Sequence, residues 1–181
     1  MPIRPGSPVP MGEPEGPRLS SLEREAMTLL LVDPVLATEQ SDETLPLRDE
    51  SARALWAAWS ASLATPEGRL DLEAFVATLD PATAALARDL LASARARGVR
   101  ADLETDREAL RVVLLRLRKE RVQERLADLQ ALISVSGRDD NDHDKEDIGE
   151  LERQFQVLHL EREQLEQAIN PAAVLAGQRR K

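Results

Sequence analysis

The densest set of side chains that could do chemistry is the run Arg-Asp-Asp-Asn-Asp-His-Asp-Lys-Glu at residues 138–146. Clustered carboxylates supply the oxygen ligands that calcium prefers, and an EF-hand loop also needs a glycine at its sixth position and a glutamate at its twelfth. A loop that begins at Asp140 would have Lys145 and Leu151 at these positions, and a loop that begins at Asp142 fails at the same two places. We therefore interpret the run as a solvated turn and predict no metal site.

Other residue types used in catalysis are sparse or badly placed. The two histidines, His143 and His159, have no partner at the spacing of a zinc site or of a histidine-based catalytic pair. The chain has no cysteine, no glycine-rich phosphate loop and no serine in a nucleophile elbow. The sequence therefore predicts no catalytic residue, no cofactor and no enzymatic activity for this chain.

Composition predicts an all-α protein. The 181 residues are 42% hydrophobic and 31% charged but only 2% aromatic, so leucine, alanine and valine must supply most of the core. Such a core suits packed helices better than a sheet, because strands favour β-branched and aromatic side chains. No apolar run approaches the roughly 20 residues of a membrane span, and the first residues lack the apolar core of a signal peptide. We expect a cytoplasmic protein with no membrane partner.

The formal net charge of −9 weighs against direct binding to a nucleic-acid backbone, which needs clustered lysines and arginines. One basic cluster stands out, although Glu120 and Glu124 interrupt it. Its members are Arg116, Arg118, Lys119, Arg121 and Arg125. We interpret this cluster as a solvated helix face, and direct nucleic-acid binding is not expected.

Helix start signals divide the first half of the chain. Residues 1–19 are rich in proline and glycine, which predicts a disordered leader or linker. Such a stretch is typical of a linker between domains, as expected if this chain is the C-terminal part of a longer polypeptide. Ser20 and Glu23 have the spacing of a capping box. Further helix starts are expected at Asp33-Pro34, Asp49, Asp71 and Asp80-Pro81. Residues 20–100 should therefore form a compact bundle of about five helices, with Trp56 and Trp59 as anchors of its core.

The second half of the chain should form a long antiparallel helical hairpin that projects from this bundle. Residues 103–133 contain no proline or glycine and sustain an apolar stripe, the acidic stretch 137–146 reverses the chain, and residues 147–169 form the returning helix. The returning helix carries a heptad seam with spacings of three and four. The seam consists of Ile148, Leu151, Phe155, Leu158, Arg162, Leu165 and Ile169. The hairpin subdomain thus spans residues 101–170, and a flexible basic tail spans residues 171–181.

Apolar residues that the seam does not use indicate where a partner could bind. Val157 and Leu160 lie off the heptad line, halfway along a projecting helix, which is typical of a protein-contact patch. Val112, Val113 and Leu115 crowd beside Leu114 and are expected either to meet the bundle at the base of the hairpin or to remain open to a partner. The hairpin is therefore predicted to dock a protein rather than to do chemistry.

The stretch 25–36 resembles the first helix of the C-terminal, helicase-binding domain of bacterial DNA primases, in which a glutamate, a leucine-rich turn and a proline followed by leucine recur. That family continues with a small bundle and a long helix rich in Leu, Arg and Glu, similar to residues 114–133 here. An acidic turn and a terminal helix follow. The resemblance covers nearly all of residues 20–170.

The resemblance implies a cytoplasmic DNA-replication role in the primosome. The chain would dock on the N-terminal domains of the hexameric replicative helicase and couple primer synthesis to unwinding. The parent polypeptide would be a DNA primase, a DNA-directed RNA polymerase, although the zinc-binding and polymerising parts are absent from this chain. The residues expected to bind the helicase are Phe155, Val157, Leu158, Leu160, Val174 and Leu175.

Other identities remain open on the sequence. A self-associating coiled-coil scaffold would pair its heptads between copies, although Arg162 in the seam favours specificity over maximal stability and the free chain is expected to be monomeric. Residues 20–98 also resemble the helicase's own N-terminal domain. An unrecognised enzyme is the third class. The long hairpin, and the absence of a nucleotide-binding motor from the sequence, favour a primase domain over a helicase domain.

Overall fold

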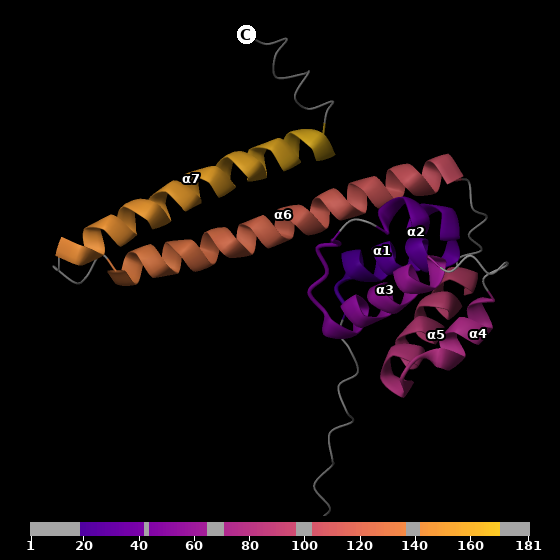
Figure 1. Ribbon diagram of the computed structural model, residues 1–181. Coiled ribbons are helices and arrows are strands. Elements are labelled where there is room, and N and C mark those ends of the chain that lie inside the picture. The colour runs from indigo at the N-terminus through magenta and orange to yellow at the C-terminus, as the bar shows by residue number, and fades with distance from the viewer. Residues whose placement is uncertain (1–18, 42–43, 65–70, 97–102, 137–141, 171–181) are drawn as a thin grey trace, which may run out of the picture.

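The computed structural model describes residues 19–41, 44–64, 71–96, 103–136 and 142–170. Every regular element in these ranges is a helix, and none is a strand, which confirms the all-α prediction. The helices are α1 (Ser21–Val32), α2 (Pro34–Gln40), α3 (Glu50–Leu63), α4 (Leu72–Thr78), α5 (Pro81–Ala96), α6 (Leu103–Ser136) and α7 (Asp142–Ile169). Helices α1 to α5 gather at one end of α6, and α7 runs back along the other end (Figure 1).

The short helices begin where polar side chains accept hydrogen bonds from their first backbone N–H groups. Ser20 and Glu23 form the predicted capping box at α1. Asp33 accepts from the second and third residues of α2, and Pro34 occupies the first helical position, where its missing N–H is not needed. The other caps are Asp49 for α3, Asp71 for α4 and Asp80 for α5. These local signals explain why five helices fit into so short a stretch.

Trp59 organises the core of the bundle. Its side chain is 1% exposed, and its indole N–H donates to the backbone oxygen of Leu30 at 2.9 Å. Its ring lies 4.8 Å from that of Phe75, measured between centroids. Trp59 therefore connects α3 to both α1 and α4, as its expected role in the core requires.

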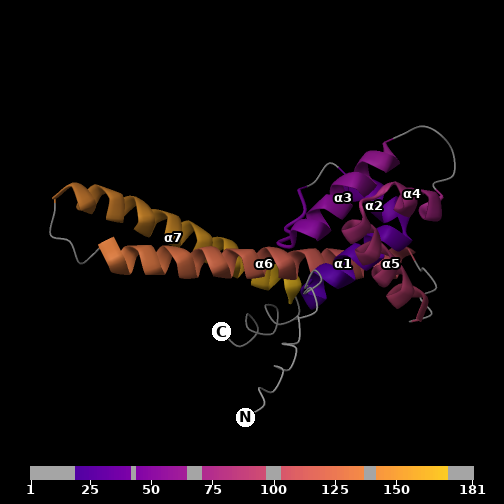
Figure 2. The same ribbon diagram turned by 90° about the horizontal axis from the view of Figure 1, so that it is seen from below.

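Helix α6 belongs to two hydrophobic clusters. Its first half contributes Leu110, Val113, Leu114 and Leu117 to the bundle core, where they pack with residues of α1 to α5. Its second half contributes Val122 and Leu126 to a small separate cluster with α7. The hairpin of α6 and α7 extends well beyond the bundle, as Figure 2 shows from below. One unbroken helix of 34 residues thus joins the two parts of the molecule.

The predicted start of the returning helix is wrong. Helix α7 begins at Asp142, five residues before the expected position, so the stretch expected to be a turn through residue 146 is partly helical. No proline or glycine occurs between Asp142 and Gly149 to stop the helix, and acidic residues are favourable near a helix N-terminus. The preceding helix ends at Ser136, three residues after the expected Ile133, since no proline or glycine occurs before Gly137 to stop it.

Candidate functional site

Val157 and Leu160 form an exposed apolar pair in the middle of α7. Their exposed fractions are 63% and 60%, although both are large aliphatic residues. A spacing of three places them next to each other on one helix face. That face points away from the seam, since Leu158 between them is buried against α6. We call Val157 and Leu160 the outer patch.

The surroundings of the outer patch are polar, with Arg125 and Glu161 among the charged residues beside it. A shallow hollow beside Val157 is lined also by Glu150, Arg153 and Gln154. Arg153 pairs with Glu150 at 2.8 Å and donates to the backbone oxygen of Gly149. An apolar centre within a polar rim is the usual anatomy of a protein interface.

The other residues predicted to bind a partner do not share this exposure. Leu158 was predicted to bind a partner, but it is 6% exposed and belongs to the cluster with Val122 and Leu126, so the hairpin does not present it at its surface. Its position in the seam accounts for its burial. Phe155 is half-buried against the same cluster and lies 4.8 Å from the His159 ring. Val174 and Leu175 lie outside the described residues.

The base of the hairpin contains charged side chains within the seam. Lys119 of α6 pairs with Glu166 of α7 at 2.9 Å, and this contact, together with nearby Arg162, lowers the pKa of the Glu166 carboxyl. Arg162 occupies the seam position expected from the heptad, and its Nε is buried with no hydrogen-bond partner among the residues that the structure describes. A buried unsatisfied donor costs about 1–3 kcal/mol, so this part of the seam is not built for maximal stability.

Replacing Arg162 by leucine is therefore expected to stabilise the hairpin by about 1 kcal/mol. Leucine removes the unsatisfied donor and completes the apolar heptad. Thermal unfolding followed by circular dichroism, together with amide exchange in α7, measures the change. Arg153→Leu is the matched control, because Arg153 is exposed on the same helix. A lower melting temperature for Arg162→Leu would contradict the predicted stabilisation and would show that the charge of Arg162 stabilises the seam.

Two further apolar residues are exposed at the far end of α6. Leu132 and Val135 have exposed fractions of 52% and 68% and a spacing of three. Sequence reasoning did not single them out. The sequence nevertheless indicated their exposure, because both lie off the stripe of Leu126 and Leu129, which packs against α7.

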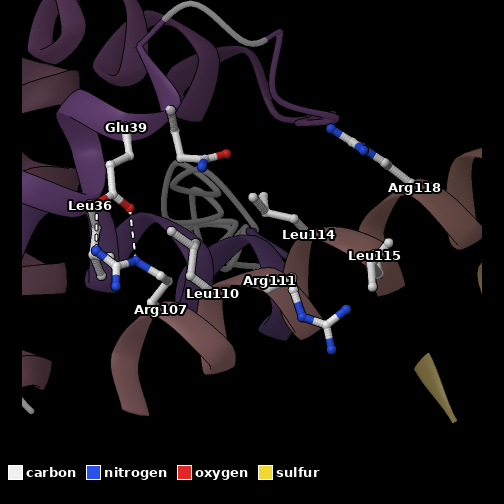
Figure 3. Close-up of a pocket in the computed structure, with 9 residues that line it drawn as sticks. Leu36, Glu39, Arg107, Leu110, Arg111, Leu114, Leu115 and Arg118 are labelled. Atoms are coloured by element: carbon white, nitrogen blue, oxygen red, sulfur yellow. Dashed lines mark hydrogen bonds and ion pairs between the residues drawn. The ribbon is translucent and has the colours of Figure 1, made fainter. Parts of the chain in front are cut away.

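A groove also lies between α2 and α6 (Figure 3). Leu36, Leu110 and Leu114 form its floor. At one end, both terminal oxygens of Glu39 accept hydrogen bonds from Arg107, so the pKa of the Glu39 carboxyl is lowered and that of the Arg107 guanidinium is raised. The ion pair fastens α2 to α6 and closes this end of the groove. The pairing of residues 68 positions apart left no local signal in the sequence.

The described residues contain no group of three or more histidine, aspartate or glutamate side chains placed to hold a metal ion. The side chains of the acidic run at 138–146, including His143, lie outside what the structure describes. His159 packs against Phe155 on α7. In the described part of the chain, no helix is long and apolar enough to cross a bilayer.

Comparison of the chain with protein-family models, with curated proteins and with solved structures gave no significant match. Functional inference therefore rests on the geometry and chemistry of the surfaces described above.

Proposed function

We propose that this chain is a protein-interaction module that docks through its helical hairpin. The observation that carries the proposal is the outer patch, a pair of aliphatic side chains more than half exposed on a helix that extends beyond the bundle. Burying such a pair on a partner is worth about 1.5–3 kcal/mol for each side chain that becomes fully covered. The module itself is proposed to be non-catalytic.

For the partner, we propose the N-terminal domains of a hexameric replicative helicase, with the chain acting as the helicase-binding part of a bacterial primase. The order of elements supports this proposal: a capped bundle, then a long helix rich in Leu, Arg and Glu, then a returning helix. In this role the bundle and hairpin would couple primer synthesis to unwinding.

Changing Val157 and Leu160 together to serine is expected to weaken binding to purified helicase N-terminal domains at least tenfold. The reason is that two apolar contacts at the centre of the interface are lost while no core residue changes. Isothermal titration calorimetry measures the affinity, and circular dichroism should show unchanged helix content. Val35→Ser is the matched control, because Val35 is a 52% exposed aliphatic residue of α2 on the bundle.

Two outcomes would contradict the proposal in different ways. Unchanged affinity in the double variant would show that the outer patch does not bind the helicase. Absence of binding by the unchanged chain, with stable self-association in light scattering at micromolar concentration, would favour a coiled-coil scaffold instead.

A further inference from the structure

The outer patch lies at the centre of a second heptad line on α7. Every residue of this line is exposed, and its spacings alternate between three and four, as they do in the seam that faces α6. We call it the outer line, and its members are Glu150, Arg153, Val157, Leu160, Gln164 and Gln167. Helix α7 lies on α6 while the bundle gathers at the opposite end of α6 (Figure 1), so this face of α7 is open along its length. A helix with a free heptad line can pack on a further helix.

The outer line is complementary to itself when two copies of α7 run antiparallel. A two-fold axis midway between Val157 and Leu160 places each of these residues opposite the other residue of the second copy. Four aliphatic side chains then cover one another at the centre of the contact and are removed from water. A two-fold contact uses the same surface of the protein twice, so no second complementary surface is needed.

The polar layers on either side of this apolar centre also match. The same axis places Arg153 opposite Gln164, where the guanidinium can donate a hydrogen bond to the amide oxygen. It places Glu150 opposite Gln167, where the carboxylate can accept a hydrogen bond from the amide N–H. Glu150 and Arg153 already form an ion pair within each copy, so neither layer brings an unpaired charge into the contact.

A parallel arrangement of the two helices is less favourable. In a parallel pair, equivalent residues of the line face each other. Arg153 would then lie opposite Arg153 of the second copy, and Glu150 opposite Glu150, so both charged layers would be repulsive. The charges of the outer line therefore select the antiparallel orientation.

The charges beside the outer patch favour a second copy over a partner of one sign. Among the described residues, the hollow next to Val157 is lined by Arg125, Arg153, Glu150 and Glu161, two of each sign. A strongly basic or strongly acidic partner would be repelled by two of these four side chains. A second copy brings the same balanced set in the reverse order along the helix.

We propose that two copies of this chain associate through the outer lines of their α7 helices, antiparallel about an axis midway between Val157 and Leu160. The dimer is weak, because each copy contributes only two aliphatic residues and the remaining layers are polar. It forms at high protein concentration and covers the outer patch, so a partner that binds this patch more tightly displaces the second copy. The proposal concerns the chain itself and does not depend on the helicase as partner.

Two variants of identical composition test the register. In the double change Gln164→Glu and Gln167→Lys, the new charges face Arg153 and Glu150 of opposite sign, and we expect the dissociation constant of the dimer to fall at least tenfold. In the reverse double change, Gln164→Lys and Gln167→Glu, like charges face each other, and we expect the constant to rise at least tenfold. Sedimentation equilibrium of the full chain from micromolar to millimolar concentration measures both, and circular dichroism should show unchanged helix content.

Disulfide formation tests the antiparallel orientation separately, because the chain has no cysteine of its own. A mixture of the Arg153→Cys and Gln164→Cys chains should form mixed disulfide dimers under mild oxidation. In either variant alone, the two thiols of an antiparallel pair would be eleven residues of helix apart, about 16 Å, which is too far for a disulfide.

Three results would overturn the proposal. The first is no self-association of the unchanged chain up to millimolar concentration, and the second is the same response from both charge variants. The third is faster disulfide formation by the Gln164→Cys chain alone than by the mixture, since only a parallel pair brings these positions together. The helicase titration enters none of these measurements, so either proposal can fail alone.

Discussion

Replacing Trp59 by alanine is expected to lower the free energy of unfolding of the bundle by about 3–5 kcal/mol. The side chain is 1% exposed, so its removal leaves a cavity between α1, α3 and α4. The substitution also deprives the backbone oxygen of Leu30 of its buried donor, and the ring of Phe75 loses its neighbour. Urea unfolding followed by circular dichroism at 222 nm measures the change.

Trp59→Phe separates the two contributions. Phenylalanine keeps an aromatic ring near Phe75 but cannot donate to Leu30, so we expect this variant to lose less stability than the alanine variant. A loss below about 1 kcal/mol for Trp59→Ala would mean that the neighbouring side chains collapse into the space. In that case, Trp59 would not be the residue that holds the three helices together.

Removal of the Glu23 carboxylate should have a comparable effect, although Glu23 lies on the first turn of a helix. The side chain is only 2% exposed. One carboxylate oxygen accepts hydrogen bonds from the backbone N–H groups of Arg48 and Asp49, and the other accepts from Ser20. Glu23→Ala leaves three N–H groups without this acceptor, and we expect a loss of about 3 kcal/mol or more in urea unfolding. Glu25→Ala, at an exposed position of the same helix, is the control.

The same carboxylate should make stability depend on pH. Burial alone would raise the pKa of Glu23, but the N–H groups of Arg48, Asp49 and Ser20 outweigh it and hold the pKa below the ordinary value of 4.5. The charged form is therefore favoured by folding, and its contribution is complete above pH 4.5 and is lost as the pH falls through the lower pKa of the folded state. Glu23→Gln lacks this titration. The stability difference between the two proteins should shrink below pH 4.5, and a constant difference would contradict the assignment.

Local chemistry explains why the helix starts could be predicted from sequence. Ser20 with Glu23, and the aspartates before Pro34 and Pro81, act within three residues of their own position, and the structure shows the expected hydrogen bonds. The second role of Glu23, at the start of α3, joins residues 25 and 26 positions apart. No local pattern distinguishes a capping glutamate from one that also binds another segment.

The exposure of residues on α7 could be predicted where helical periodicity alone decides it, whereas their role in binding stays a prediction. Val157 and Leu160 lie off the heptad line and are exposed, while Leu158 lies on it and is buried; choosing Leu158 for docking conflicted with that same periodicity. The groove beside α2 could not be predicted, because it depends on how α2 and the segment 44–46 lie against α6. The ion pairs of Arg48 with Glu120 and Glu124 depend on the same packing.

Because α6 is one unbroken helix, it fixes the orientation of the bundle relative to the hairpin. Each residue of a helix advances by about 100° and 1.5 Å, so the number of residues between the bundle core and the α7 cluster defines both a separation and a rotation. A partner that held the bundle and the hairpin together would have to match both values. Leu117 of the first cluster and Val122 of the second are only five residues apart on one helix. The separation and the rotation between the bundle and the hairpin are therefore set by α6 alone.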